Sequence, residues 1–167
     1  MEDIIKIVEL SPLRVVSFHV KESEVPEEEA WRSLEAWAKP KGLFDDPMKH
    51  QIFGFNNPIP MGENKLRGYE FWVTIPDSFP PDDTVTVKIF QGGLYAVMTC
   101  RGVYNIGTAW SKLYEWSKSN ERFKLAYPKD YDYANSPALE LEHHTNPRVT
   151  DVNEIVFDCY MPICLSA

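Results

Sequence analysis

The chain has 167 residues, of which 44% are apolar and 13% aromatic, enough for one substantial hydrophobic core. We therefore expect a single domain spanning residues 1–167. The 17 basic and 25 acidic residues give a net charge of −8, which repels nucleic acids and anionic lipid surfaces because the basic residues are scattered. No segment approaches the roughly 18 consecutive apolar residues of a membrane-spanning helix. Composition thus argues against direct nucleic-acid binding and against membrane insertion.

The start of the chain and its cysteines favour the cytoplasm. The first residues are acidic and lack the basic and then continuously apolar design of a secretory signal. The three cysteines, Cys100, Cys159 and Cys164, are odd in number, have no C-x-x-C spacing and stand in apolar, strand-like contexts. We interpret them as buried apolar side chains in a reducing compartment, with a reactive thiol as the alternative.

The first predicted elements are a strand, a helix and two further strands. Residues 14–20 are rich in β-branched and aromatic types, which favours a half-buried strand. A helix is expected over about 24–37, because a proline and three acids suit its first turn and apolar residues then recur at helical spacing. Two more strands are expected at 51–55 and 69–75.

The same order of elements recurs in the second half. Residues 30–37 match residues 109–116 with four identities (Ala, Trp, Leu, Trp) at a constant offset of 79. Two tryptophans six positions apart are rare enough that chance is a poor explanation. Strand-like runs at 94–100, 138–144 and 155–161 surround the second copy as strands surround the first.

These elements predict an α+β fold of two tandem strand-helix-strand-strand units related by a pseudo-twofold axis. We place repeat one at about 5–76, a linker at 77–90 and repeat two at about 91–165. The linker begins with prolines and aspartates, which do not continue a strand ladder. A unit of roughly 80 residues is marginal alone, so the antiparallel sheets of the two units should pair. A groove at their junction is then a natural ligand site.

Polar side chains align on the third strand of the second unit. Strict alternation over 138–144 puts two glutamates and a histidine on one face and apolar side chains on the other. Alternation in the last strand likewise sets an aspartate and a tyrosine on one face. The polar face of the strand at 138–144 carries Glu140, Glu142 and His144. If the two strands are neighbours, we expect Glu142, His144, Asp158 and Tyr160 to form one acidic patch edged by an aromatic ring, with Glu140 as a further ligand-binding candidate.

Two kinds of chemistry fit such a patch, and an ordinary solvent-exposed strand edge is the alternative. An acid at the floor of an apolar cleft attracts a cation whose rings stack on aromatic side chains. A carboxylate whose pKa is raised by burial can instead act as a general base on water or as a general acid toward a leaving group. The aromatic walls that we expect are Trp31, Phe55, Trp72 and Trp110.

Metal and nucleotide motifs are weak in this sequence. His143 and His144 are adjacent on a strand and therefore point to opposite faces, and there is no H-E-x-x-H helix or Cys/His spacing. Gly92 and Gly93 precede a strand, which fits a turn and not a phosphate-binding loop. We therefore expect neither a metal nor a cofactor.

Several short motifs keep an order and spacing that are specific when taken together. They are Glu9–Val16, Ala30–Leu34, Ile52–Phe55 before Asn57-Pro58, Tyr69–Phe71, Gly93–Val97, Arg101-Gly102, Leu113–Trp116, Leu141-Glu142 and Phe157–Ile163. Over nearly the whole chain, from about Ile5 to Ile163, this pattern resembles the GyrI-like effector-binding family. That family includes the ligand-binding domains of multidrug-sensing transcription regulators and many stand-alone proteins.

The resemblance implies a tandem fold whose central glutamate, matching Glu142, binds cationic drug-like ligands, with Asp158 and Tyr160 helping to line the pocket. Some stand-alone members are described as hydrolases that open strained cyclopropane rings of DNA-alkylating natural products, using a pocket carboxylate to activate water. Two positions depart from the family. His144 stands where an aromatic is common, which alters pocket polarity and leaves ligand preference open, and Asn57 replaces an aspartate before a loop proline, a turn substitution.

Three functional hypotheses follow. The leading one is a stand-alone protein, monomer or homodimer, that binds amphipathic, cationic or polyaromatic small molecules. The alternative is a cyclopropane-opening hydrolase in which Glu142 activates water and Tyr160 or His144 orients or protonates the substrate. The third is an interaction protein whose carboxylates spread over an exposed convex face. Regulators of this type carry a helix-turn-helix domain before the effector module, whereas the module here starts within the first few residues, so we expect no direct contact with nucleic acid.

Overall fold

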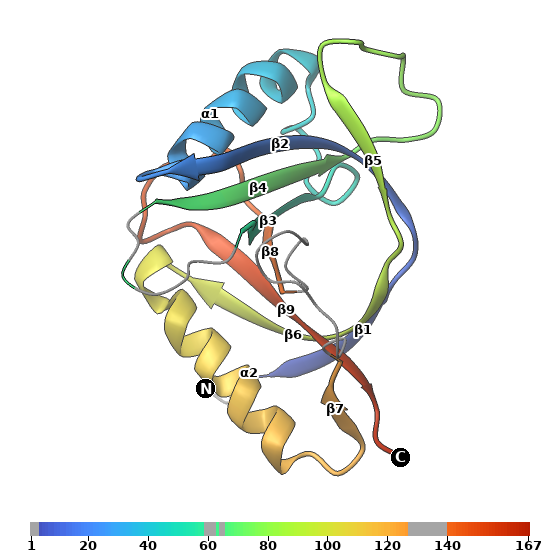
Figure 1. The fold of residues 1–167 in the computed structure, drawn as a ribbon, viewed down its shortest axis with the longest axis vertical. Coiled ribbons are helices and arrows are strands. Elements are labelled where there is room, and N and C mark those ends of the chain that lie inside the picture. Colours follow the sequence, from blue (N-terminus) through green and yellow to red (C-terminus); the bar gives the residue numbers. More distant parts are fainter. Residues whose placement is uncertain (1–3, 59–62, 64–65, 127–139) are drawn as a thin grey trace.

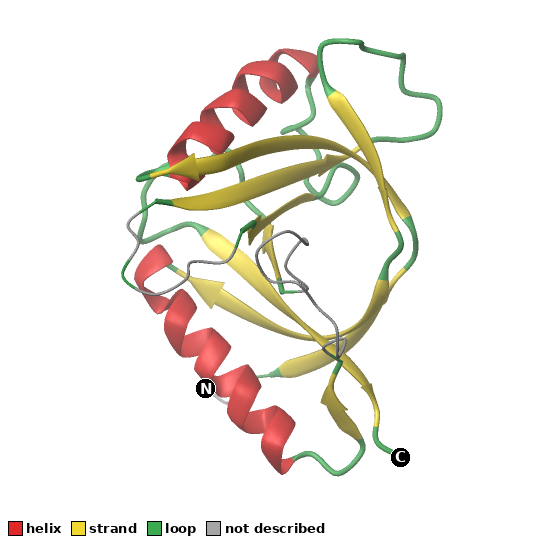
Figure 2. Ribbon diagram, viewed as in Figure 1, coloured by secondary structure: helices red, strands yellow, loops and turns green. Residues whose placement is uncertain are grey.

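The computed structural model describes residues 4–58, 63, 66–126 and 140–167. Two α-helices, α1 (Pro26–Ala38) and α2 (Ile106–Ser119), lie outside a strongly curved antiparallel sheet (Figures 1 and 2). Short 3₁₀ turns follow α1 and precede α2, at Lys39–Lys41 and Val103–Asn105. No helix in the described part of the chain is long and apolar enough to cross a membrane.

The strands pair in the order β1-β6-β9-β8-β3-β4-β2-β5, and β7 pairs with β9 outside this series. All of the recorded pairings are antiparallel. The strands are β1 (Ile5–Leu10), β2 (Leu13–Ser23), β3 (Ile52–Asn56), β4 (Arg67–Thr74), β5 (Thr86–Phe90), β6 (Gly93–Arg101), β7 (Phe123–Leu125), β8 (Leu141–His144) and β9 (Val156–Leu165).

The two predicted units are visible in this order. The first contributes β2, α1, β3 and β4, and the second contributes β6, α2, β8 and β9. Outward from the β3–β8 junction, the strands of the first unit follow in the order β3-β4-β2 and those of the second unit in the order β8-β9-β6. In both units this is the order of the third, the fourth and then the first element. The mixed α and β fold with its large antiparallel sheet is confirmed. Of the strand expected at 138–144, residues 138 and 139 lie outside the described residues.

Two strands that the sequence did not predict join the halves. β5 lies inside the segment expected to be a linker, and it pairs with β2 of the first unit. β1 lies within the range predicted for repeat one, before the first strand expected there, but it pairs with β6 of the second unit. The pairs Leu10–Gly93 and Leu13–Phe90 continue one register, so β1–β2 and β5–β6 act as two long bent strands that run side by side. Figure 1 shows these strands curling the sheet round on itself.

Gly92 permits the bend between β5 and β6. Its φ of +77° lies in the left-handed region, and a Cβ there would come within 2.0 Å of the Leu10 carbonyl oxygen. Any other residue would both strain the backbone and collide with the neighbouring strand. The glycine pair that the sequence indicated as a turn is therefore the point where the two long strands bend together.

The core has three parts, which follow from alternation along the curved sheet. On the outer surface, α1 packs over β2 and β4 through Leu34, and α2 packs over β6 and β9 through Leu113; both leucines are fully buried. The inner surface holds a third cluster around Phe53 and Tyr160, to which both halves contribute. Since α1 and α2 each cover their own half, the outer surface of the central β3–β8 pair lies between them.

Candidate functional site

A cleft of about 690 Å³ opens between the beginnings of the two helices. Its walls come from α1, from the facing ends of β3 and β4, from the turn that leads into α2, and from the loop between β8 and β9. Glu142 and His144 of β8 also line the cleft. The groove expected at the junction of the two units is thus present, and a single strand supplies two of its polar side chains.

Glu142 is a largely buried acid in this cleft. Its carboxylate accepts hydrogen bonds from the Tyr69 hydroxyl at 3.3 Å and from the Trp110 indole N–H at 3.3 Å. No cationic side chain of the described residues pairs with it. Burial raises the pKa of Glu142 above its ordinary value, although the two hydrogen bonds oppose that rise. The carboxylate is therefore held by neutral donors and lacks a balancing charge.

The Tyr69 hydroxyl remains protonated and can therefore donate to Glu142. Burial, reinforced by the nearby Glu142 carboxylate, raises the pKa of Tyr69 well above its ordinary value, so the hydroxyl keeps its proton. Gly54 stands directly opposite Glu142 in the β3–β8 ladder. A Cβ at Gly54 would lie 2.5 Å from the Tyr69 hydroxyl oxygen and 2.7 Å from the Phe71 ring. The missing side chain at Gly54 therefore gives Tyr69 the space that it occupies beside Glu142.

Aromatic rings form one wall of the cleft. The Trp31 ring stacks on His144 with centroids 4.7 Å apart at 20°, and it meets Phe71 edge-on at 5.3 Å. The His144 ring in turn meets Phe157 edge-on at 4.9 Å. Burial, with a smaller effect of His143, lowers the pKa of His144 to about 4, so its ring is neutral at pH 7. This wall is rigid and carries no charge of its own.

The rim of the cleft is acidic. Helix α1 presents Glu27, Glu28 and Glu35 to it, and the lining contains one cationic side chain, Arg67. Arg67 donates to the Glu27 carboxylate at 2.6 Å and to the Glu24 carbonyl oxygen at 2.6 Å. Because Arg67 is engaged at the rim, it offsets Glu27 and not the deeper Glu142. The described lining therefore carries a net negative charge, which would attract a positively charged molecule.

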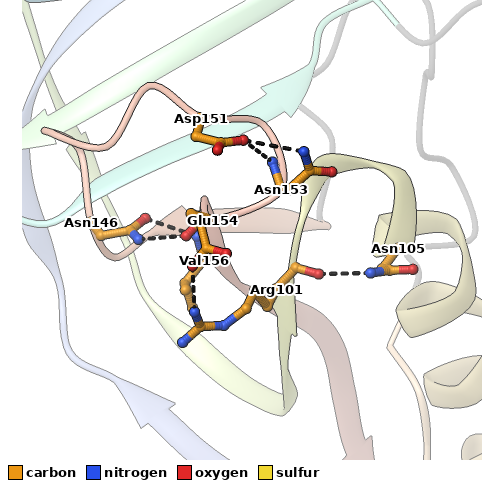
Figure 3. Close-up of polar contacts among 7 residues, drawn as sticks. All are labelled: Arg101, Asn105, Asn146, Asp151, Asn153, Glu154 and Val156. Atoms are coloured by element: carbon orange, nitrogen blue, oxygen red, sulfur yellow. Dashed lines mark hydrogen bonds and ion pairs between the residues drawn. The ribbon is translucent and has the colours of Figure 1, made fainter.

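The loop between β8 and β9 closes the far side of the cleft and is held in place by polar contacts (Figure 3). One of them joins the loop to β6: the Arg101 guanidinium pairs with Glu154 at 2.7 Å. Within the loop, the Asn146 side chain donates to the Glu154 carbonyl oxygen at 2.9 Å. Further hydrogen bonds fix the loop and the start of α2, and they involve Asn105, Asp151, Asn153 and Val156. These contacts fix the position of the loop and therefore of the cleft wall that it forms.

Four of the predicted site residues meet around the cleft. Glu142 and His144 line it from β8, Trp31 lines it from α1, and Trp110 reaches Glu142 from α2. The two tryptophans are the matching residues of the internal repeat. Since both lie off the apolar stripe of their helices, they reach the junction between the units. The pseudo-twofold arrangement thus brings the same residue of each repeat to one site.

The expected acidic patch of Glu142, His144, Asp158 and Tyr160 is wrong. In the β8–β9 register, Glu142 stands opposite Cys159, and His143 stands opposite Asp158. Asp158 and Tyr160 therefore face the inner surface with His143, on the other side of the sheet from Glu142. Asp158 accepts from the Thr99 hydroxyl at 2.6 Å, and Tyr160 packs in the inner core.

Three other predicted residues also lie away from the cleft lining. Phe55 and Trp72 pack against each other on the inner surface, with ring centroids 4.6 Å apart. Because side chains alternate along β3 and β4, Phe55 and Trp72 lie on the other face of the sheet from Phe71, which lines the cleft. Glu140 is exposed just before β8 and does not line the cleft.

Sequence reasoning missed the donor Tyr69 and a second buried acid, Glu70. Glu70 is fully buried on the inner surface, where it accepts hydrogen bonds from Ser17, Lys88 and, at 3.1 Å, Asn57. A lone acid inside an otherwise apolar strand was the available signal. In the described part of the chain, no three His, Cys, Asp or Glu side chains come together in a way that could hold a metal ion.

Solved structures share this fold at low sequence identity. A hydrolase from Listeria innocua is 9% identical with a TM-score of 0.64, and the match covers 96% of this chain and 91% of that one. A structure of SAV2435 bound to tetraphenylphosphonium is 13% identical with a TM-score of 0.57, covering 98% and 94%. EcmrR in its DNA complex is 14% identical with a TM-score of 0.63; the match covers 96% of this chain, which spans only 57% of the EcmrR chain.

Among curated protein sequences, the search found no match. The model of one protein family does match, and it spans residues 4–163, nearly the whole chain. The match includes both units, the Glu142 strand and the cleft between the helices. The chain therefore belongs to the GyrI-like small molecule binding domain family.

Proposed function

We propose that this protein binds amphipathic cationic molecules with aromatic rings in the cleft between α1 and α2, and that Glu142 is the charge anchor. The observation that carries the proposal is the Glu142 carboxylate itself, which is largely buried, lines the cleft, accepts from two neutral donors and has no cationic partner among the described residues. A buried charge without a counter-charge costs free energy, and a bound cation would offset that cost.

The surrounding residues support the same ligand class. A cation at about 4 Å from Glu142 would gain roughly 4 kcal/mol in a partly desolvated site before its own desolvation is counted. A cation held over an aromatic ring of the cleft wall would gain about 0.5–2 kcal/mol more. The acidic rim of α1 would attract such a ligand from solution, with an attraction that weakens as salt concentration rises.

Calorimetric titration with tetraphenylphosphonium, the ligand bound by the related SAV2435 structure, tests this proposal directly. We expect wild-type protein to bind it, and Glu142→Gln to bind it at least about 10-fold more weakly, which corresponds to about 1.4 kcal/mol. Gln keeps the size and the acceptor oxygen of the side chain, so a loss of affinity reports the charge.

Glu121→Gln is the matched control, because it removes one carboxylate from an exposed position outside the cleft. Its affinity should equal that of wild type once salt is at about 0.15 M, where distant surface charges are screened. Equal weakening in Glu121→Gln and Glu142→Gln would mean that net charge, and not the cleft carboxylate, determines binding.

A second candidate function is hydrolysis of a strained ring in the same cleft. It is favoured by the raised pKa of Glu142, which suits a general base that takes a proton from water, and a related Listeria innocua structure is described as a hydrolase. Tyr160 would have no part in it, because it lies on the inner surface. Incubation with a cyclopropane-bearing alkylator tests this candidate: a ring-opened product that forms faster than in buffer and not with Glu142→Gln supports it, and turnover at the buffer rate rejects it.

A further inference from the structure

His144 is the one polar group of the aromatic wall, and stacking alone does not account for it. Its side chain is 6% exposed and lies between the Trp31 face and the Phe157 edge. A phenyl ring would make the same two ring contacts without polar atoms. An imidazole in this position brings two nitrogens into an apolar environment, which costs free energy unless they find hydrogen-bond partners.

Among the described residues, no such partner is found for His144. The His144 Nδ1 atom is buried and has no hydrogen-bond partner. No described residue hydrogen bonds to its Nε2 atom, and the next histidine, His143, points to the inner surface. A buried polar group without a partner in a binding cleft is a group whose partner arrives with the ligand.

The position of His144 relative to Glu142 sets a distance. The two residues are separated by one position on β8, so their side chains leave the same face of the strand about 7 Å apart. Burial keeps the pKa of His144 near 4, and a neutral ring therefore does not repel a cation held by Glu142 at pH 7. Glu142 thus offers a negative charge and His144 a neutral hydrogen-bonding group, at a spacing that the strand sets.

We infer that His144 determines ligand specificity: the cleft prefers cations that carry a hydrogen-bonding group, such as a hydroxyl or carbonyl, about one aromatic ring away from the positive centre. This inference rests on the proposed cation site at Glu142 and names the ligand class within it. Trp31 and Phe157 orient the imidazole, and one of its ring nitrogens bonds the ligand.

Two phosphonium ligands of equal size separate this inference from the proposed function. (4-Hydroxymethylphenyl)triphenylphosphonium carries a hydroxyl, and (4-ethylphenyl)triphenylphosphonium replaces it with a methyl group. Wild type should bind the hydroxyl ligand about 5-fold more tightly, the effect of one net hydrogen bond. His144→Phe should bind the two ligands with equal affinity. Because the readout is the ratio of two affinities in the same variant, any effect of the substitution on phosphonium binding as a whole cancels.

A preference that persists in His144→Phe, or a wild type that binds both ligands equally, would overturn the inference and leave the cation site standing. Failure of wild type to bind either of these ligands or tetraphenylphosphonium would overturn both. Nitrogen NMR of the imidazole gives a readout that needs no variant: the His144 ring resonances should shift with the hydroxyl ligand beyond the shift with the ethyl ligand. Identical shifts with both ligands would also contradict the inference.

Discussion

Two glutamates of this protein, Glu70, which is fully buried, and Glu142, which is largely buried, lie on opposite surfaces of one sheet and have opposite electrostatic environments. Glu70 faces the inner core, where Lys88, Ser17 and Asn57 all donate to it. Glu142 faces the cleft, where Tyr69 and Trp110 donate and no cation of the described residues is paired with it. A buried charge that the protein itself neutralises stabilises the fold, whereas one that it leaves unbalanced is available to a ligand.

The titration of the two acids expresses this difference. Burial alone would raise the pKa of Glu70, but the hydrogen bonds and the Lys88 charge lower it below its ordinary value. Burial also acts to raise the pKa of Glu142, no cation of the described residues opposes it, and the pKa is raised. The contribution of Glu70 to stability is therefore lost as pH falls through its lowered pKa. The cost of charged Glu142 has the opposite sign, and it disappears as the pH falls through the raised pKa to the ordinary carboxyl range.

The largest predicted effect is the loss of the Glu70 counter-charge. Lys88→Met leaves the Glu70 carboxylate buried with only neutral donors, and it should lower the free energy of unfolding by about 2–3 kcal/mol. This value lies below the roughly 3–5 kcal/mol that is typical of broken buried pairs, because the Lys88 side chain is 39% exposed. Urea unfolding measures the change. Tetraphenylphosphonium affinity should not change, and a parallel loss of affinity would show that the two acids are not independent.

A somewhat smaller effect is expected from Gly54→Ala, on β3 directly opposite Glu142. The new methyl group overlaps the space of the Tyr69 hydroxyl and the Phe71 ring, so unfolding free energy should fall by about 1–2 kcal/mol. Displaced Tyr69 would no longer donate to Glu142, and ligand affinity should change as well. Tyr69→Phe is the control for the second effect, since it removes the donor without crowding. Unaltered stability in Gly54→Ala would contradict the close contact at this position.

The smallest effect is a gain in stability from Glu142→Gln. Without ligand, the substitution removes an unbalanced buried charge, and unfolding free energy at pH 7 should rise by about 1 kcal/mol. Because the folded-state pKa of Glu142 is raised, the gain should shrink as pH is lowered and vanish below the ordinary carboxyl pKa of about 4. Thermal unfolding at several pH values measures it. Glu70→Gln, measured in parallel, should lower the free energy of unfolding at pH 7. A similar loss of stability in Glu142→Gln and Glu70→Gln would contradict the difference between the two acids.

The sequence predicted well what depends on local patterns. The repeat of Trp31 at Trp110, the strands on either side and the shared face of Glu142 and His144 all came from spacing and alternation, which depend on neighbours in the chain. The choice of Glu142 as the central acid came from the family resemblance. β5 was missed because a five-residue strand that follows an aspartate-rich segment is defined by pairing with β2, about 70 residues away.

The errors at the site have one physical source. Alternation tells which side chains share a face within a strand, but not which face of one strand continues that of the next. A shift of one residue in the β8–β9 register exchanges the two sets, and it is this register that puts Asp158 and Tyr160 on the inner surface. Tyr69 was missed for a related reason, since its contact with Glu142 joins residues 73 positions apart.

The central claim is that the Glu142 charge selects cations, and a pair of ligands of one shape and opposite charge tests it most directly. Tetraphenylphosphonium and tetraphenylborate should be titrated into wild type and Glu142→Gln in the same buffer. We predict that wild type prefers the phosphonium by about 100-fold or more, and that the preference falls to about 10-fold or less in Glu142→Gln. Equal affinity of wild type for the two ions, or a preference that Glu142→Gln leaves intact, would contradict the account.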